Sequence, residues 1–354
     1  MVGVYEQVQD YYGKVLKTKQ DLQTSACCPA ESLPDYLKPI VSKVHPEILE
    51  RFYGCGVPLP SALEGCTVLD LGSGTGRDVY VLSQLVGEKG FVIGVDMTEE
   101  QLEVAHRHID HHMKEFRYAK PNVSFRKGFM EDLKAVGIED NSIDLVVSNC
   151  VFNLSPNKEE LFKEVFRVLK PAGELYFSDV FTDRRLSAEI QGDAVLRGEC
   201  LGGALYVEDY RRMLAKYGCQ DGRTVSTDAL AITNPKLREK LGAARFWSLT
   251  KRAFKLDLED RCEDYGQVAY YQGTIPGAPS EFKLDDHHTF HTHKPMLVCG
   301  NTAKMVSETR FGRHFEVVGD QVHHLGLFDC ASPTQTNSLQ SQNDTAESSG
   351  GSCC

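Results

Sequence analysis

The 354-residue sequence lacks an excess of positive charge, because 39 Lys and Arg stand against 50 Asp and Glu and give a formal net charge of −11. A broad electrostatic grip on nucleic acid requires a basic face, so the composition argues against a nucleic-acid partner. No apolar run approaches the ~20 residues of a membrane span, and the first 20 residues lack the apolar centre of a signal peptide. We therefore expect a soluble cytosolic protein with no membrane partner. The sequence does not determine the oligomeric state, and we take the protein to be a monomer.

The sequence also lacks the C-x-x-C pairs that are typical of zinc sites. A disulfide scaffold is not expected either, because such proteins are small and secreted. The chain nevertheless holds 12 cysteines: Cys27, Cys28, Cys55, Cys66, Cys150, Cys200, Cys219, Cys262, Cys299, Cys330, Cys353 and Cys354. Free cysteines are often small buried hydrophobes, which suits Cys66 and Cys219. It suits less well those that lie beside glycines or just beyond a strand.

Residues 1–54 are predicted to be mostly helical. Tyr5, Val8 and Tyr12 recur at three- and four-residue spacings, which places them on one helix face. A second helical stretch is expected over 35–52, before the break at Gly54-Cys55-Gly56-Val57-Pro58.

From residue 67 the pattern alternates between strands and helices. Strands are predicted at 67–71, 90–96, 123–126, 143–148 and 174–180, with helices at 77–86, 98–118 and 158–169 between them. Such alternation predicts a parallel sheet covered on both faces, that is, an α/β Rossmann-like fold.

The pattern weakens after residue 185, where helices are expected near 186–196 and 207–217. Residues 229–330 are predicted to form a smaller α+β region, and the Ser/Thr/Gln/Asn-rich stretch 331–354 a disordered tail. We thus divide the chain into an N-terminal helical segment (1–54), a central domain (55–228), the α+β region and the tail.

A glycine turn follows the first predicted strand, with the sequence Asp70-Leu71-Gly72-Ser73-Gly74-Thr75-Gly76. Glycines at this place permit positive φ and let the backbone approach a ligand. The dinucleotide fingerprint G-x-G-x-x-G requires a third glycine where this chain has Arg77. The match is to D-x-G-x-G-x-G, the signature of class I S-adenosylmethionine methyltransferases.

Two further features support a cofactor site of this kind. Asp96 ends the next strand, where a carboxylate accepts both ribose hydroxyls, and Met97 after it is placed to pack on the adenine. Met130 and Glu131 follow the third strand, a common adenine-contacting position. The predicted cofactor contacts are Tyr53, Asp70, Gly72, Ser73, Gly74, Asp96, Met97, Met130, Glu131 and Asn149.

Three cysteines lie where core packing does not explain them. Cys150 follows the strand 143–148, at the carboxyl end of the predicted sheet, where ligands bind in open α/β folds. Cys200 and Cys55 each have glycine neighbours, which give the backbone freedom and access.

These segments together resemble the arsenite methyltransferase family over about residues 5–320. The resemblance rests on Tyr53-Gly54-Cys55-Gly56, Asp70-Leu71-Gly72-Ser73-Gly74, Ser148-Asn149-Cys150, Gly173-Glu174-Leu175-Tyr176-Phe177-Ser178-Asp179-Val180 and Gly198-Glu199-Cys200-Leu201-Gly202-Gly203-Ala204-Leu205. The cysteine-bearing segments are specific to that family, whereas the glycine turn marks only the superfamily.

The resemblance implies a methyltransferase that uses S-adenosylmethionine and acts on trivalent arsenic. Arsenic prefers soft thiolates, so Cys55, Cys150 and Cys200 are the implied ligands, with Cys150 and Cys200 as the lasting pair. The arsenic lone pair would attack the sulfonium methyl without a general base. A thiol pair including Cys27 would then reduce pentavalent arsenic, with thioredoxin or glutathione as the final reductant.

Two alternatives remain at this point: a methyltransferase for another thiophilic or small organic acceptor, and a protein that only binds arsenic through thiols. The tract His287-His288-Thr289-Phe290-His291-Thr292-His293 is either a metal site or, as we expect, a solvated strand. The helical His106, His108, His111 and His112 are expected to face water, and no role is assigned to Cys28, Cys353 or Cys354.

Overall fold

The computed structural model describes residues 2–10, 33–52 and 54–329. The sequence predictions for Cys27, Tyr53 and the tail 331–354 lie outside these ranges.

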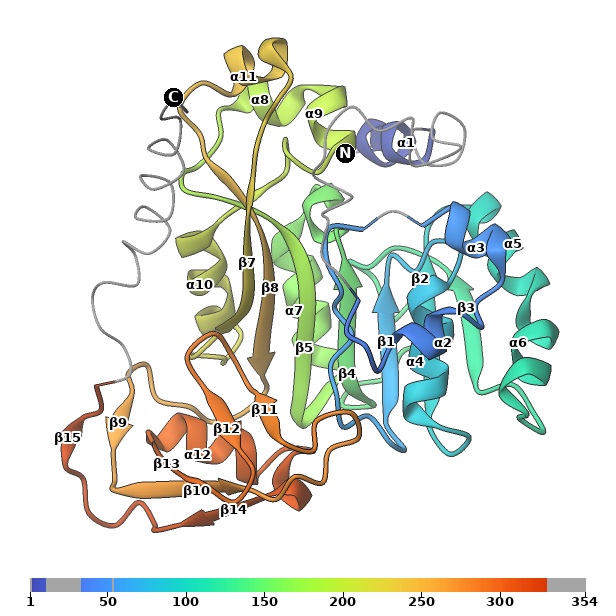
Figure 1. The fold of residues 1–354 in the computed structure, drawn as a ribbon. Helices are drawn as coiled ribbons and strands as arrows, with labels where there is room; N and C mark the ends of the chain where they lie inside the picture. The colour runs from blue at the N-terminus through green and yellow to red at the C-terminus, as the bar shows by residue number, and fades with distance from the viewer. Residues whose placement is uncertain (1, 11–32, 53, 330–354) are drawn as a thin grey trace, which may run out of the picture.

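In the described part of the chain, eight strands form one large sheet in the order β3-β2-β1-β4-β5-β8-β7, with β6 paired to β5 (Figure 1). Its five predicted strands are all present and parallel: β1 (Thr67–Leu71), β2 (Phe91–Asp96), β3 (Val123–Lys127), β4 (Ile143–Asn149) and β5 (Leu169–Thr182). β6 (Leu205–Tyr206) is also parallel to β5. The carboxyl ends of these strands therefore meet at one edge of the sheet.

Two more strands extend the sheet beyond the predicted parallel set. β7 (Arg223–Leu230) and β8 (Phe246–Phe254) run antiparallel at the edge next to β5. The boundary drawn at residue 228 therefore falls inside a strand, and the sheet continues to Phe254. β7 is a half-buried edge strand, and β8 is buried along its whole length although it contains Lys251 and Arg252. Neither strand shows the hydrophobic alternation that would reveal it.

Helices cover both faces of the sheet, and several are shorter than predicted. They are α1 (Val2–Asp10), α2 (Lys38–Val41), α3 (Pro46–Glu50), α4 (Arg77–Val86), α5 (Glu99–Arg107), α6 (Ile109–Phe116), η3 (Phe152–Leu154), α7 (Lys158–Val168), α8 (Ala188–Gly192), α9 (Ala194–Gly198), α10 (Val207–Lys216) and α11 (Pro235–Leu241). The predicted helices 35–52, 98–118 and 186–196 are each split in two. The last one breaks at Asp193, whose carboxylate accepts hydrogen bonds from the Val195 and Leu196 amides and so begins α9.

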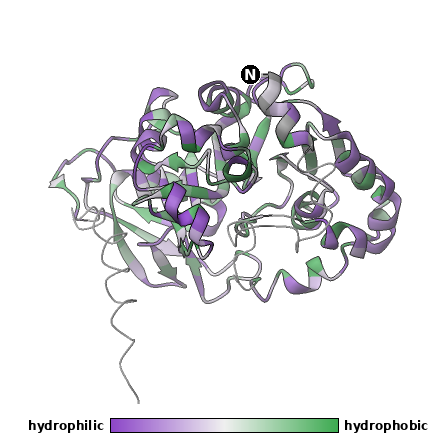
Figure 2. Ribbon diagram, turned by 90° about the horizontal axis from the view of Figure 1, so that it is seen from above, coloured by the Kyte–Doolittle hydropathy of each residue, from purple (hydrophilic) through white to green (hydrophobic). Residues whose placement is uncertain are grey.

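The sheet separates two hydrophobic cores, because successive strand residues point to opposite faces. On β1, Val68 packs into the core under α4 and α5, whereas Leu69 packs into the core under α7 and α10. Figure 2 shows the same arrangement from above, with hydrophobic residues concentrated inside and hydrophilic residues on the outer helices.

We call residues 263–327 the C-terminal unit. It contains β9 (Glu263–Asp264), β10 (Gln267–Tyr271), β11 (Glu281–Lys283), β12 (Thr289–His291), β13 (Pro295–Val298), α12 (Gly300–Ser307), η4 (Gly312–His314), β14 (Phe315–Val318) and β15 (Gly326–Leu327). Figure 1 shows it at the lower end of the large sheet, opposite α1, α8 and α9. It therefore lies at the amino ends of the parallel strands.

Buried ion pairs join the C-terminal unit to the large sheet. Glu174 of β5 is fully buried and pairs with Arg252 of β8 and with Arg310 of the C-terminal unit. Arg223 of β7 likewise pairs with Asp285 at 3.0 Å. A buried charge that loses its partner is costly, so these contacts make the two parts dependent on each other. None of the described helices is long and apolar enough to cross a membrane.

Candidate active site

The glycine turn lies between β1 and α4, as predicted, and its backbone requires glycine. Gly72 and Gly74 have φ values of 73° and 52°, which are unfavourable for residues with a side chain. A Cβ atom on Gly72 would also lie 2.4 Å from a methyl carbon of Val151. The turn therefore brings bare backbone to the carboxyl edge of the sheet.

A pocket of about 1050 Å³, counting the part open to solvent, lies over this turn. Nine of the ten predicted cofactor contacts line it, namely Asp70, Gly72, Ser73, Gly74, Asp96, Met97, Met130, Glu131 and Asn149. The tenth, Tyr53, lies outside the described residues. Cys150 lines the same pocket, so the predicted cofactor and cysteine sites share a wall.

The carboxylates of the pocket make it suitable for a cation. Asp96 accepts hydrogen bonds from the Gly74 amide (2.9 Å) and the Thr98 amide (2.8 Å). Burial raises the pKa of Asp96. The pKa of Asp70 is raised well above its usual value, first by burial and then by repulsion from the nearby carboxylates of Asp78 and Asp96. The positively charged sulfonium and amino groups of S-adenosylmethionine would offset this repulsion.

Helix α1 covers the pocket, which the sequence did not predict. The Tyr5 ring packs on Phe129 with centroids 4.7 Å apart, and Gln9 donates a hydrogen bond to the Met97 carbonyl at 2.9 Å. Burial, together with nearby Glu131, raises the pKa of Tyr5 to about 12. The helical spacing of Tyr5 and Val8 was the available signal, but it does not say what the apolar face covers.

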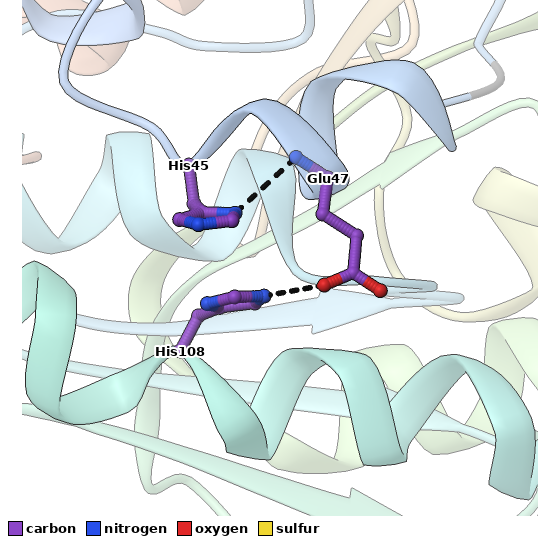
Figure 3. A group of neighbouring side chains, drawn as sticks. All are labelled: His45, Glu47 and His108. Carbon is purple, nitrogen blue, oxygen red and sulfur yellow. Dashed lines mark hydrogen bonds and ion pairs between the residues drawn. The ribbon is translucent and has the colours of Figure 1, made fainter.

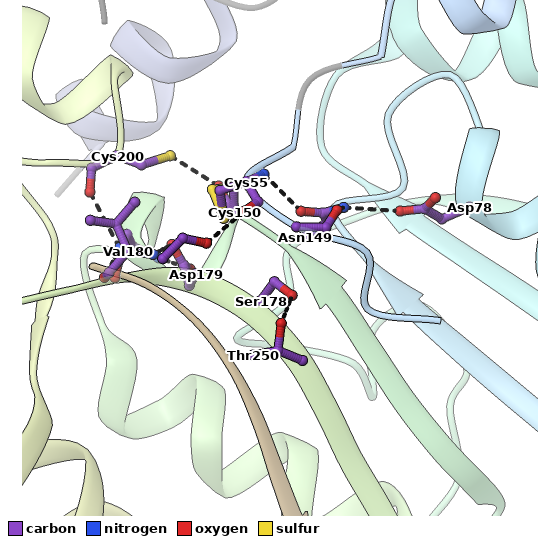
Figure 4. Close-up of a disulfide and its surroundings, with 12 residues drawn as sticks. Cys55, Asp78, Asn149, Cys150, Ser178, Asp179, Val180, Cys200 and Thr250 are labelled. Carbon is purple, nitrogen blue, oxygen red and sulfur yellow. Dashed lines mark hydrogen bonds between the residues drawn. A yellow bond between two sulfur atoms is a disulfide. The ribbon is translucent and has the colours of Figure 1, made fainter. Parts of the chain in front are cut away.

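The three predicted cysteines come together beside the pocket (Figure 4). Cys55 and Cys150 form a disulfide with Cα atoms 5.6 Å apart, and the Cys200 thiol donates to the Cys150 carbonyl at 3.1 Å. Two of the three predicted ligand sulfurs are thus joined to each other in this structure, and the assignment of the three cysteines as arsenic ligands stays a prediction. The fourth predicted cysteine, Cys27, lies outside the described residues.

Backbone geometry also distinguishes two of these cysteines. Cys150 and Cys200 have φ values of 60° and 61°, in the left-handed region that non-glycine residues rarely adopt. Such conformations cluster at functional sites. All three cysteine side chains are buried, with Cys200 inaccessible to solvent.

Asp179 is a site residue that the sequence analysis missed. Its carboxylate lies within 4.8 Å of the Cys55 and Cys150 sulfurs and accepts hydrogen bonds from the Asn153 and Val180 amides. Burial raises its pKa to about 7. The available signal was an aspartate near the carboxyl end of β5, which the hydrophobic run around it obscured.

Comparison with known proteins identifies the family. Residues 62–218 match a family model described as a methyltransferase domain, and residues 264–354 match one described as the arsenite methyltransferase C-terminal domain. The chain is 55% identical over 327 residues to the arsenite methyltransferase of Aquipseudomonas alcaligenes, covering 92% of this chain and 94% of that protein. The human arsenite methyltransferase is 43% identical over 329 residues, covering 91% and 86%. The chain belongs to the arsenite methyltransferase family.

A solved structure agrees with this assignment to the arsenite methyltransferase family. CrArsM, described as an arsenic(III) S-adenosylmethionine methyltransferase from Chlamydomonas reinhardtii, is 50% identical, with a TM-score of 0.82 over 84% of this chain and 100% of that chain. The predicted family, the class I α/β fold and the classification as an S-adenosylmethionine-dependent methyltransferase are confirmed. The C-terminal family match begins at residue 264, not at 229, which agrees with β7 and β8 belonging to the large sheet.

A second group of potential ligand atoms lies away from this site, on α3 and at the start of α6 (Figure 3). The His45 and His108 rings stack with centroids 3.7 Å apart, and Glu47 accepts from His108 at 2.8 Å. His45 Nδ1 accepts from the Glu47 amide and so begins α3. Ring nitrogens of nearly parallel imidazoles point side by side and do not converge on one ion. We therefore interpret the group as a contact that joins the two helices.

The histidine predictions were partly wrong. His108 and His112 are buried, not exposed, and burial lowers the pKa of His112 to about 4. His112 stacks on Tyr80 and accepts a hydrogen bond from the His45 amide. In the tract 287–293, His288 is buried and bonded to Asp285, whereas His287, His291 and His293 are exposed. The tract thus contains one buried histidine with a structural role and three exposed histidines.

Proposed function

We propose that this chain transfers a methyl group from S-adenosylmethionine to trivalent arsenic held by Cys55, Cys150 and Cys200. One observation carries the proposal. Cysteines from three distant segments come together beside the pocket that carries the methyltransferase motif, and one of them, Cys150, lines that pocket.

The chemistry of arsenic fits these residues. Each thiol that replaces a hydroxyl of arsenite forms one As–S bond and releases one water molecule. The resulting pyramidal arsenic would keep a lone pair that bonds to the electrophilic methyl group of S-adenosylmethionine while the methyl–sulfur bond breaks, so that S-adenosylhomocysteine leaves and arsenic becomes pentavalent. Alignment of two reactants ~3–3.5 Å apart is worth up to ~7–11 kcal/mol, so the protein can act mainly by positioning.

The Cys55–Cys150 disulfide must be opened before arsenic can bind there. Two thiols of glutathione or one reduced thioredoxin would supply the two electrons and two protons. After methyl transfer, oxidation of a thiol pair to a disulfide would return arsenic from the pentavalent to the trivalent state. We assign Cys27 to that pair, and we place the enzyme in the cytoplasm as a monomer.

Cofactor recognition is assigned to the pocket residues. Asp96 would accept the ribose hydroxyls, and the acidic side chains Asp70 and Asp78 would favour the cationic part of S-adenosylmethionine. Tyr53 is proposed to complete this set.

The test is transfer of labelled methyl groups from S-adenosylmethionine, with and without arsenite, after reduction by glutathione. We expect transfer to depend on arsenite, and to be retained in Cys262→Ser, a control cysteine outside the site. Transfer that is independent of arsenite, or equal in Cys150→Ser and in the control, would contradict the proposal.

A further inference from the structure

The loop that carries Cys55 is held by side chains from two strands of the large sheet, and Figure 4 shows one of them, Asn149. Asn149, at the end of β4, accepts a hydrogen bond from the Cys55 amide at 3.0 Å and donates one to the Gly56 carbonyl at 2.9 Å. Ser248 of β8 donates to the Cys55 carbonyl at 2.5 Å. Both peptide groups that flank the Cys55 side chain are therefore bonded to the sheet.

A buried acidic group fixes the orientation of the Asn149 amide. Asn149 Nδ2 also donates to Asp78 at 3.2 Å, and Asp78 accepts from Arg77 at 2.7 Å. A flipped amide would place its oxygen against this carboxylate. The Arg77 guanidinium in turn lies 4.1 Å from the centroid of the Phe52 ring, at the start of the same loop.

The loop packs against these side chains as closely as its backbone allows. A Cβ atom on Gly54 would lie 2.7 Å from Asn149 Nδ2, and one on Gly56 would lie 2.5 Å from Ser178 Oγ. Contacts this short do not occur, so any side chain at either position would push the loop away. The glycines beside Cys55 thus let the loop backbone pack closely against the side chains of Asn149 and Ser178, in addition to giving access to the thiol.

We propose that Asn149 and Ser248 are positioning residues that keep the Cys55 thiol beside Cys150 when the disulfide is open. The disulfide fixes the pair only while it is formed, whereas arsenic binding requires it to be reduced. The hydrogen bonds from Asn149 and Ser248 to the loop backbone, which we call the clamp, then maintain a high effective concentration of one thiol near the other. This inference rests on the proposed function, and it reassigns Asn149, because both hydrogens of its amide are used by Gly56 and Asp78 and not by the cofactor.

The first experiment needs no arsenic. The full-length protein is equilibrated in glutathione redox buffers, and the Cys55–Cys150 disulfide is quantified by alkylation and mass spectrometry. Asn149→Ala removes two hydrogen bonds to the loop, so we expect the equilibrium constant for disulfide formation to fall about tenfold. Ser248→Ala removes one bond, and a fall of about threefold is expected.

Asn122→Ala is the matched control. Asn122 is also a buried asparagine, but its amide nitrogen donates to the Ser83 and Gly87 carbonyls at the C-terminal end of α4. We expect this variant to lose thermal stability and to keep the wild-type disulfide equilibrium within about twofold. The comparison separates positioning of Cys55 from general destabilisation.

The second experiment compares two substrates in the same variants. Inorganic arsenite would use three thiolates, whereas monomethylarsenite needs only two. Asn149→Ala should therefore lower kcat/KM for arsenite about tenfold more than for monomethylarsenite. Ser248→Ala should shift the same ratio by less and leave the KM for S-adenosylmethionine unchanged, because Ser248 does not line the cofactor pocket.

The outcomes separate this proposal from the proposed function. A weakened disulfide with an unchanged substrate ratio supports the clamp and contradicts the role of Cys55 as third arsenic ligand. An unchanged disulfide equilibrium in both Asn149→Ala and Ser248→Ala overturns the clamp, as does a change confined to the KM for S-adenosylmethionine. If Asn149→Ala does not fold, Ser248→Ala decides alone.

Discussion

The cofactor pocket and the cysteine site share Cys150 but are built in different ways. The pocket is formed largely by short stretches that directly follow β1, β2 and β3, and each stretch carries its own recognisable pattern. The cysteine site joins segments that are 50 and 95 residues apart, and its donor atoms change with redox state. The segments of the pocket can therefore be recognised one by one from local sequence, whereas the cysteine site becomes visible only when distant segments pack together and its disulfide is reduced.

The largest expected effect on methylation comes from substitutions of the cysteines. Cys150→Ser and Cys200→Ser should each reduce methylation of arsenite and of monomethylarsenite by more than about 100-fold, because a hard hydroxyl replaces a soft ligand. Cys55→Ser and Cys27→Ser should lose arsenite but retain monomethylarsenite. Product speciation by chromatography measures this, with S-adenosylmethionine affinity by calorimetry as the control. Equal loss of both substrates in Cys55→Ser would contradict the division of roles.

A substitution in the cofactor pocket should weaken cofactor binding and leave arsenite binding intact. Asp96→Ala removes a charged acceptor for the ribose and for the Gly74 amide, so S-adenosylmethionine affinity should fall roughly 10- to 100-fold. Arsenite binding to the reduced thiols should change less than about twofold. Calorimetry on both ligands tests this, and Asp110→Ala, on the exposed side of α6, is the control. Unchanged cofactor affinity would refute the ribose assignment.

A glycine substitution should move the cysteine loop without touching a thiol. Gly56→Ala forces the loop away from Ser178, and we expect about a tenfold loss of arsenite methylation, since a small misplacement of a reactant is costly. Gly192→Ala is the matched control, because a Cβ atom there meets nothing within 4 Å. Wild-type rates in Gly56→Ala would show that the loop tolerates displacement.

The smallest expected effect is the pH dependence of S-adenosylmethionine affinity. Burial and neighbouring carboxylates raise the pKa of Asp70, so the cofactor-free pocket takes up a proton at a pH above the ordinary range near 4. A cationic ligand favours the ionised form, so affinity should increase as pH rises, by at most about tenfold per pH unit for one proton. Calorimetry in buffers of different ionisation enthalpy should detect proton release on binding. Asp70→Asn should reduce that release.

The sequence predicted the parallel strands, the glycine turn and Asp96, because each depends on neighbours within a few residues. It did not predict β8, since Lys251 and Arg252 are buried against groups that are distant in sequence. It placed His112 in water, although tertiary packing against Tyr80 buries it. Cys55, Cys150 and Cys200 were identified as a group from resemblance, but their oxidation state is a property of the environment and not of the residue order.

The ion pairs between the large sheet and the C-terminal unit have a consequence for truncation of the chain. Although the C-terminal family match begins at residue 264, a gene truncated there would encode a chain in which Glu174 loses Arg310 and Arg223 loses Asp285. Glu174 would keep Arg252 and Arg223 would keep Asp221, but each would lose one of its ion-pair partners, and the truncated product would be less stable. In this protein the methyltransferase domain therefore depends for part of its stability on the residues that follow it.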